Sequence, residues 1–265
     1  MLKPSVADLR TLVERRWHGA VARVGAAPLP GVPTGDAALD AALGSNGIPR
    51  GRVTEVFGAA SSGKTTLTFA MLAACTRAGE IAAFVDMPRA FFAPAAAAAG
   101  IDLRRLLVVQ PSNGAAARHA VDALVRGGAC ALVALDCADR PDALRAHHCA
   151  RLVGQAEKTG TALVVLSEGH ISAVASFASV RLRAEGLTPC WQTGSAGSGR
   201  LAGCIVSIAV AKSRTTAPGK HVRVAAFVPD VAGTFFAEPS DPRLAPAILH
   251  LDETDERHDR SFVTA

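Results

Sequence analysis

The 265-residue sequence contains no tyrosine, only two tryptophans and ten phenylalanines, so aromatic residues make up 5% of the chain. Proteins that hold single-stranded nucleic acid commonly stack its bases on aromatic side chains, and few are available here. Lysine is also scarce, because it accounts for only five of the 28 basic residues. An extended base-stacking surface is therefore not expected.

No run of about 18 or more residues is both apolar enough and free of charges or helix breakers, so no membrane-spanning helix is predicted. The first residues, "MLKPSVADLR", also lack the apolar region of a secretory signal. Hydrophobic residues nevertheless make up 49% of the chain and the mean hydropathy is +0.26, which excludes global disorder. We expect a cytoplasmic protein with a large core and no membrane partner.

The six cysteines include no CxxC pair and lie in apolar or helical context, which favours buried, reduced thiols. The run His147–Cys149 suggests a metal site at first sight. Adjacent residues on a helix point in different directions, so no zinc site is expected there. The cysteines are Cys75, Cys130, Cys137, Cys149, Cys190 and Cys204.

The net charge of +5 is unevenly distributed, because the last fifteen residues carry −3 and the rest of the chain carries +8. A basic body is compatible with a polyanionic partner. The excess of arginine and alanine also fits a GC-rich coding bias, so the charge supports nucleic-acid binding only weakly.

Apolar segments alternate with helical segments through the middle of the chain, which predicts a parallel sheet covered on both faces. The predicted strands are "RVTEVFG", "IAAFVD", "LLVVQP", "ACALVALD" and "TALVVLSE". The predicted helices run from the glycine-rich loop to Ala78 and over Arg89–Ala99, Ala115–Arg126 and Arg140–Thr159. After Phe177, the runs "SVRLRAEG", "CIVSIAVAKS" and "HVRVAAFVP" alternate and predict antiparallel strands that complete the sheet. The fold class is therefore α/β, with a mostly parallel twisted sheet and an antiparallel C-terminal edge.

The two ends of the chain differ from this core. Residues 5–17 place Leu9, Val13 and Trp17 on one face at helical spacing, and "AVARVG" then alternates like a short strand. From Pro239 onward, proline and then charge dominate, which predicts an ordered segment followed by a flexible acidic tail. We therefore divide the chain into residues 1–27, a core of 28–239 and a C-terminal segment of 240–265.

The stretch "GAASSGKTTL" directly follows a predicted strand and precedes a predicted helix. Gly58, Gly63, Lys64 and Thr65 fill the phosphate-loop pattern GxxxxGK[ST], in which backbone N–H groups surround the phosphates. Lys64 would reach the β- and γ-phosphates, and the Thr65 hydroxyl would ligate Mg²⁺. The predicted ATP-binding residues are Gly58, Ala59, Ala60, Ser61, Ser62, Gly63, Lys64, Thr65 and Thr66.

A magnesium site at such a loop needs an acid at the end of a neighbouring buried strand. Asp136, which closes "ALVALD", is the preferred candidate, and Asp86, which closes "AFVD", is the alternative. Apolar strands also end in aspartate for turn formation alone, so the pattern leaves both readings open.

The stretch "GIPRGRVTEVFGAASSGKTTL" resembles the signature region of bacterial RecA recombinases, as do "PTGDAALDAALG", "FASVRL" and "AKSRTTAPGK". The resemblance covers roughly residues 6–237 in order. It implies a RecA-like core that binds ATP and Mg²⁺. It also implies that the N-terminal helix and strand, with Leu9, Val13 and Trp17, dock onto RecA or onto a second copy of this chain.

The sequence departs from the RecA pattern at positions that matter for catalysis. Pro88 stands where the family has the glutamate that activates water, and proline cannot act as a base. Glu168 replaces the glutamine that senses the γ-phosphate, and a carboxylate there would repel that phosphate. Only eight residues separate Glu168 from Phe177, so the DNA-gripping loop is much shortened.

Four basic residues lie near the region that resembles the interface lysines of RecA: Lys212, Arg214, Lys220 and Arg223. A DNA or subunit interface is one interpretation, and solvated surface is the other. Direct binding of single-stranded DNA is expected to be weak, because the loops are short and aromatic residues are few.

An intact phosphate loop, a missing catalytic glutamate and shortened DNA loops together resemble the ImuA family of RecA-like accessory proteins. That resemblance implies an adaptor for error-prone translesion DNA synthesis, with polymerase components as partners and weak or absent ATP hydrolysis. The alternative is an active DNA-dependent ATPase of the RecA type. Its base would then come from another carboxylate, such as Asp86, or from across a filament interface.

Overall fold

The computed structural model describes residues 31–137, 140, 143–169, 172–193, 199–227 and 247–251. The predicted N-terminal helix and strand, with Leu9, Val13 and Trp17, lie outside these residues, as does the predicted acidic tail after residue 251. Within the described part of the chain, no helix is long and apolar enough to cross a membrane.

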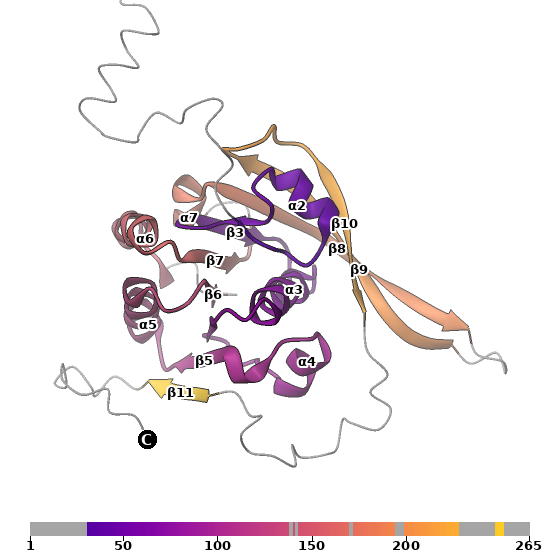
Figure 1. Cartoon of the computed structure of the whole chain (residues 1–265), viewed down its shortest axis with the longest axis horizontal. Helices are drawn as coiled ribbons and strands as arrows, with labels where there is room; N and C mark the ends of the chain where they lie inside the picture. Colours follow the sequence, from indigo (N-terminus) through magenta and orange to yellow (C-terminus); the bar gives the residue numbers. More distant parts are fainter. Residues whose placement is uncertain are drawn as a thin grey trace, which may run out of the picture.

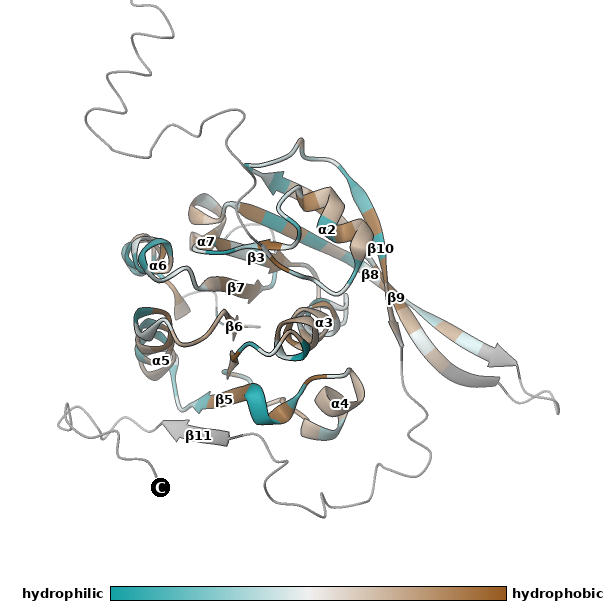
Figure 2. Cartoon of the chain, in the orientation of Figure 1, coloured by the Kyte–Doolittle hydropathy of each residue, from teal (hydrophilic) through white to brown (hydrophobic). Residues whose placement is uncertain are grey.

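A nine-stranded sheet forms the centre of the molecule in the order β10-β9-β8-β3-β7-β6-β4-β5-β11 (Figure 1). The strands from β8 to β11 in that order run parallel, whereas β9 is antiparallel to both of its neighbours. The bounds are β3 Val53–Phe57, β4 Ala82–Asp86, β5 Leu106–Pro111, β6 Leu132–Asp136, β7 Ala162–Ser167, β8 Val180–Thr193, β9 Gly199–Ser213, β10 His221–Phe227 and β11 Ala247–Leu251. The central parallel strands are almost fully buried because helices cover both faces of the sheet, and Figure 2 shows that these strands are mostly apolar.

Helices pack on both faces of this sheet and create two separate hydrophobic cores (Figure 1). One core lies beneath α2 (Ala37–Leu43), α3 (Lys64–Arg77) and α4 (Ala93–Ala98). The other lies beneath α5 (Gly114–Gly127), α6 (Ala146–Thr159) and α7 (Ala173–Phe177). A 3₁₀ turn, η1 (Leu103–Arg105), precedes β5. This arrangement confirms the predicted fold class, including the antiparallel edge.

Two helices begin later than their sequence patterns predict. The helix expected from Arg89 begins only at Ala93, because Asp86 holds the preceding turn through the backbone N–H groups of Ala90 and Phe91. Pro94 is the second residue of this helix, and proline is favoured in the first turn of a helix. The helix expected from Arg140 begins at Ala146. The five central strands agree with the predicted segments to within a few residues.

The strands β8 and β9 are longer than predicted and project from the body as a two-stranded ribbon (Figure 1). The prediction ended the first strand at Gly186. A change of register between Ala184 and Gly186 instead marks a bulge, and the pairing with β9 continues to Thr193. Pro189 is compatible with this ribbon because β3 pairs with β8 only as far as Arg183, which leaves one side of the strand open.

Two further pairings were not predicted. Residues of the proline-rich segment form β1 (Gly31–Val32), which pairs antiparallel with β2 (Ile48–Pro49) as a small second sheet. At the other end of the chain, β11 pairs parallel with β5 and closes that edge of the main sheet. The C-terminal segment therefore contributes a strand to the core sheet.

Candidate nucleotide-binding site

The phosphate loop connects the end of β3 to the start of α3 at the carboxyl edge of the sheet. Gly63 precedes the helix with a φ of +95°, and Ser61 is also left-handed with a φ of +59°. A Cβ at Gly63 would lie 2.7 Å from Cγ1 of Val206, and one at Gly58 would lie 2.4 Å from the carbonyl oxygen of Ala184. The glycines therefore allow the loop to pack directly against β8 and β9 while it curves around the helix start.

Lys64 is 8% exposed and turns its ammonium back toward the loop. Its Nζ donates to the carbonyl oxygens of Gly58 at 2.9 Å and Ala59 at 2.7 Å. The carboxylate of Glu168 lies 3.8 Å from the same nitrogen. Lys64 and Glu168 are thus neighbours.

The remaining loop residues leave a polar surface open at the helix start. Ala59, Ala60, Ser61 and Thr65 are exposed, and Thr66 is half-buried. The Ser62 hydroxyl is buried and lacks a hydrogen-bond partner within the described residues. Backbone N–H groups, an unsatisfied hydroxyl and a buried cation at a helix N-terminus fit a phosphate group. The residues present therefore suit a nucleotide, and Thr65 is accessible for Mg²⁺.

Both candidate magnesium ligands end neighbouring strands, and Asp86 lies opposite Asp136 in the parallel register of β4 and β6. Asp86 is 1% exposed and accepts hydrogen bonds from the backbone N–H groups of Ala90 and Phe91 and from Nε2 of Gln110. Asp136 is 8% exposed at the same edge of the sheet. Since Asp86 binds the turn that follows β4, Asp136 is the better candidate for the metal.

Pro88 lies in that turn and is exposed. The turn is fixed by Asp86 and passes through Arg89, which has a φ of +56°. Pro88 offers no group that could accept a proton from water.

Sequence reasoning missed a buried ion pair next to the phosphate loop. Glu55, in the middle of β3, is 0% exposed and pairs with Arg181 of β8. It also accepts hydrogen bonds from the hydroxyls of Ser167, at 2.8 Å, and Ser172. The Arg181 guanidinium lies 4.3 Å above the ring of Phe57, the last residue of β3 before the loop. The one sequence signal was a lone acid inside an otherwise apolar strand.

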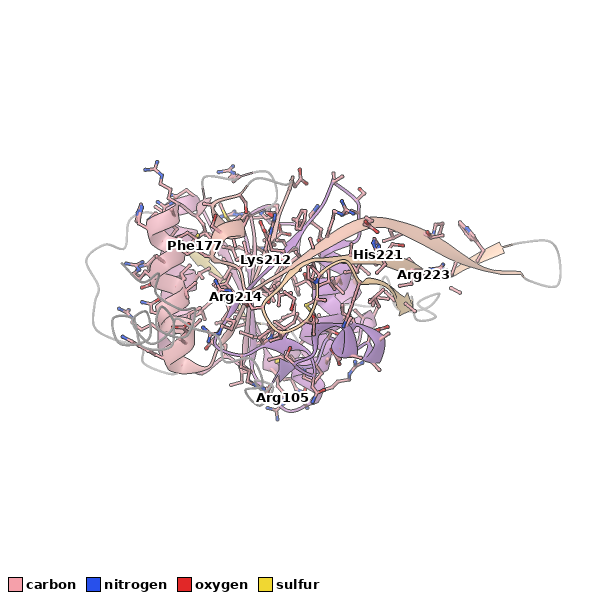
Figure 3. All side chains as sticks on the ribbon, turned by 90° about the horizontal axis from the view of Figure 1, so that it is seen from above. Arg105, Phe177, Lys212, Arg214, His221 and Arg223 are labelled. Carbon is pink, nitrogen blue, oxygen red and sulfur yellow. The ribbon has the colours of Figure 1, made fainter. Side chains whose placement is uncertain are left out.

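The basic residues predicted as an interface occupy different environments (Figure 3). Lys212 donates to the carbonyl oxygens of Ala175 and Ser176 at the end of α7, and burial, followed by Arg214 and Arg181, lowers its pKa. Lys220 donates to the carbonyl oxygen of Ala42 at the end of α2. Both lysines thus interact with helix C-termini of their own chain.

The other two predicted interface residues point to solvent. Arg214 and Arg223 are exposed, and Figure 3 shows them well apart along the antiparallel edge. The four residues therefore do not form one compact cluster.

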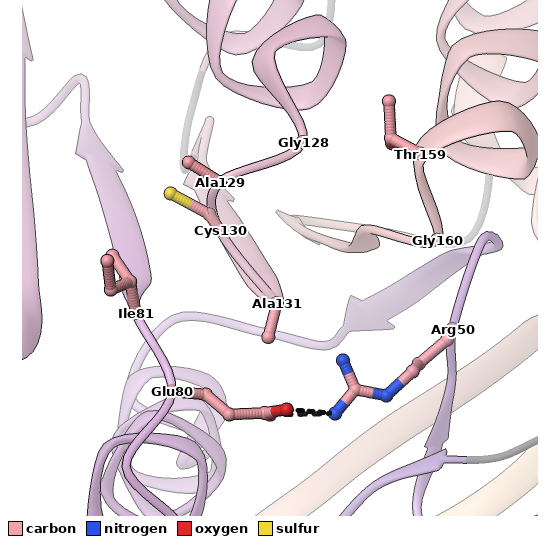
Figure 4. A pocket seen from close by; sticks show the side chains of 9 residues that line it. All are labelled: Arg50, Glu80, Ile81, Gly128, Ala129, Cys130, Ala131, Thr159 and Gly160. Atoms are coloured by element: carbon pink, nitrogen blue, oxygen red, sulfur yellow. Dashed lines mark hydrogen bonds and ion pairs between the residues drawn. The ribbon is translucent and has the colours of Figure 1, made fainter.

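A pocket lies at the amino edge of the sheet, opposite the phosphate loop, beside the starts of β4 and β6 (Figure 4). Arg50 and Glu80 form an ion pair across it at 2.7 Å. Gly128 and Gly160, which end α5 and α6, also line it. Its charged pair is internally satisfied, so this pocket offers no comparable phosphate site.

The chain matches the family model of the RecA N-terminal domain over residues 9–163. It belongs to the RecA family. It is 41% identical over 184 residues to a protein named RecA from Leifsonia xyli and 41% identical over 175 residues to that of Streptomyces coelicolor. These matches cover 68% and 64% of this chain but 47% and 43% of the relatives, so the chain spans less than half of their length.

A solved structure titled as the RadB recombinase has a similar fold, with a TM-score of 0.55 and 20% identity over 72% of this chain and 94% of that one. This likeness concerns the fold alone. Membership of the RecA family supports nucleotide binding at the phosphate loop.

Proposed function

We propose that this chain is a nucleotide-binding protein of the DNA damage response that hydrolyses ATP slowly or not at all. It would act as an adaptor for error-prone translesion synthesis, in the manner of ImuA. In this proposal ATP and Mg²⁺ are ligands of the phosphate loop, held by Lys64, Thr65 and Asp136. Bound nucleotide would stabilise one conformation of the protein, or its slow hydrolysis would set the lifetime of that conformation.

The observation that carries the proposal is the environment of Asp86 at the end of β4 and of Pro88 in the turn that follows it. Hydrolysis needs a base that can accept a proton from the attacking water. Pro88 cannot accept one, and both oxygens of Asp86 are engaged by the turn after β4. The phosphate loop is complete, whereas the position at which RecA proteins carry the catalytic glutamate is occupied by Pro88, which cannot accept a proton.

The partners in this proposal are RecA or a second copy, docked through residues 1–27, together with translesion polymerase components. Direct contact with single-stranded DNA would be weak. Lys212 and Lys220 support this view, because both use their ammonium groups on carbonyl oxygens of their own chain.

A second candidate is an active DNA-dependent ATPase of the RecA type that acts in recombination and repair. The names and the 41% identity of the relatives favour it over the adaptor. The intact phosphate loop and Asp136 are compatible with it. In this case the base would come from a neighbouring subunit.

Steady-state ATP turnover, measured with and without single-stranded DNA beside a bacterial RecA control, separates the two candidates. The adaptor proposal expects nucleotide binding with turnover far below the RecA control and no stimulation by DNA. DNA-stimulated turnover comparable to the control would reject it. Lys64→Ala, which removes the phosphate-binding ammonium, serves as the control for nucleotide binding.

A further inference from the structure

Three acceptors surround the ammonium of Lys64. An ammonium group has three N–H donors, and two of them are directed to the carbonyl oxygens of Gly58 and Ala59. The third neighbour is Glu168, with Oε1 at 3.8 Å from Nζ. The positive charge of the lysine that would bind phosphate is therefore partly neutralised by a carboxylate of the same chain.

The backbone holds this carboxylate next to the loop. β7 and β3 are paired so that Ser167 lies opposite Phe57, and the next residues of the two strands are Glu168 and Gly58. Ser167 is itself fixed by its hydrogen bond to Glu55. Glu168 consequently follows a buried and paired strand end beside the first glycine of the phosphate loop.

The charge of Glu168 affects a triphosphate more than a diphosphate. The lysine of this motif lies between the β- and γ-phosphates, so a carboxylate within 4 Å of its ammonium is close to the terminal phosphate. Carboxylate and phosphate repel each other, and the triphosphate carries one more negative charge than the diphosphate. The Glu168 side chain is 41% exposed and solvent weakens the repulsion, so an effect of about tenfold in affinity is reasonable.

We propose that Glu168 is a specificity-determining residue that makes this site prefer a nucleoside diphosphate to a nucleoside triphosphate. The inference rests on the proposed function, because it assumes that the phosphate loop binds nucleotide. In the diphosphate complex Lys64 contacts the β-phosphate and keeps its ion pair with Glu168. A triphosphate must bring its terminal phosphate close to that carboxylate.

Equilibrium titrations of ADP and of a non-hydrolysable ATP analogue, each with Mg²⁺, test the inference. The wild-type protein should bind the diphosphate about tenfold more tightly. Glu168→Gln, which keeps size and removes charge, should bring the two dissociation constants within about twofold, mainly by tightening triphosphate binding. Glu157→Gln is the matched control, because Glu157 pairs with Arg52 on the other side of the sheet, and it should leave the ratio unchanged.

The outcomes separate this inference from the proposed function. Equal affinities in the wild-type protein, or a ratio that does not respond to Glu168→Gln, would overturn the inference and leave nucleotide binding intact. Absence of binding of either nucleotide to the wild-type protein would overturn both. Thermal unfolding of Glu168→Gln checks that the variant is folded, and ADP should raise its melting temperature as it does for the wild-type protein.

Discussion

Asp86 and Asp136 are register partners at the ends of the neighbouring parallel strands β4 and β6, yet the structure gives them different surroundings. Asp86 accepts three hydrogen bonds from the segment that follows its own strand and from β5. Asp136 ends the strand next to β7, which in turn neighbours the phosphate-loop strand β3. We therefore propose different roles for these two chemically identical residues, a structural role for Asp86 and metal binding for Asp136.

Replacement of Asp86 should act on stability. Asp86→Ala leaves the N–H groups of Ala90 and Phe91 and the amide of Gln110 without their acceptor, which should cost about 2 kcal/mol of unfolding free energy. Asp86→Asn keeps one acceptor oxygen and should cost less. Urea denaturation measures both. Wild-type stability of Asp86→Ala would contradict a structural role.

Replacement of Asp136 should act on the magnesium dependence of nucleotide binding. Asp136→Asn should weaken binding of Mg²⁺–nucleotide by about tenfold and leave metal-free binding unchanged. Thr65→Val should have the same effect, whereas Glu157→Gln, on α6 and paired with Arg52, is the control. Titrations with and without EDTA provide the comparison. If EDTA changed nucleotide binding equally in all three variants, this result would argue against Thr65 and Asp136 as the magnesium ligands.

The buried pair Glu55–Arg181 should be much more important for stability than the partly exposed pair Arg50–Glu80. Arg181→Leu leaves a carboxylate uncompensated at 0% exposure and should cost about 3–5 kcal/mol. Arg50→Leu breaks a pair whose side chains are 27% and 35% exposed and should cost about 1 kcal/mol or less. Chemical denaturation of the two variants under the same conditions gives the comparison. Equal losses would show that burial is not what distinguishes them.

Four of the cysteines should resist thiol reagents while the protein is folded. Burial raises the pKa of Cys75 to about 12 and that of Cys149 to about 11, and it also raises the pKa of Cys130 and Cys137. Their thiolate fraction at pH 8 is therefore far below that of the unfolded chain.

The same shifts predict how stability depends on pH. Because folding raises the pKa of these thiols, their contribution to stability is fully present below the pKa of the unfolded thiol, near 9. This contribution is lost as pH rises above that value.

Maleimide labelling at pH 8, followed by mass spectrometry, should modify Cys75 and Cys149 only after denaturant is added. Rapid labelling of Cys75 in the native protein would contradict the described burial.

Trp17 is predicted to anchor the N-terminal segment on a partner, and it lies outside the described residues. Trp17→Ala should therefore weaken self-association or binding to RecA and leave the melting temperature unchanged. Analytical ultracentrifugation and a thermal melt on the same preparation measure both properties. A large fall in melting temperature would instead indicate that Trp17 packs on its own core.

The sequence predicted those features that depend on residues close together in the chain. The phosphate loop is defined within eight residues, and its position between a strand and a helix followed from hydrophobic pattern alone. The central strands were predictable for a similar reason, since strands buried on both faces are continuously apolar.

Features that depend on strand pairing could not be predicted in this way. Glu55 and Arg181 are 126 residues apart, and only the pairing of β3 with β8 brings them together. The prediction ended β8 at Gly186, because the continuation of this strand as a projecting ribbon depends on its pairing with β9 and on where β3 stops. The contact between Lys64 and Glu168 also follows from register, between β3 and β7.

A single-turnover experiment tests most directly the claim that the site binds nucleotide but lacks a hydrolytic base at the position of Pro88. Protein in excess over Mg²⁺–ATP is mixed with single-stranded DNA, and released phosphate is followed with time beside a bacterial RecA control. We predict that bound ATP remains intact over the period in which the control completes its turnover. Release of phosphate in an amount equal to the bound ATP within that period would contradict this account.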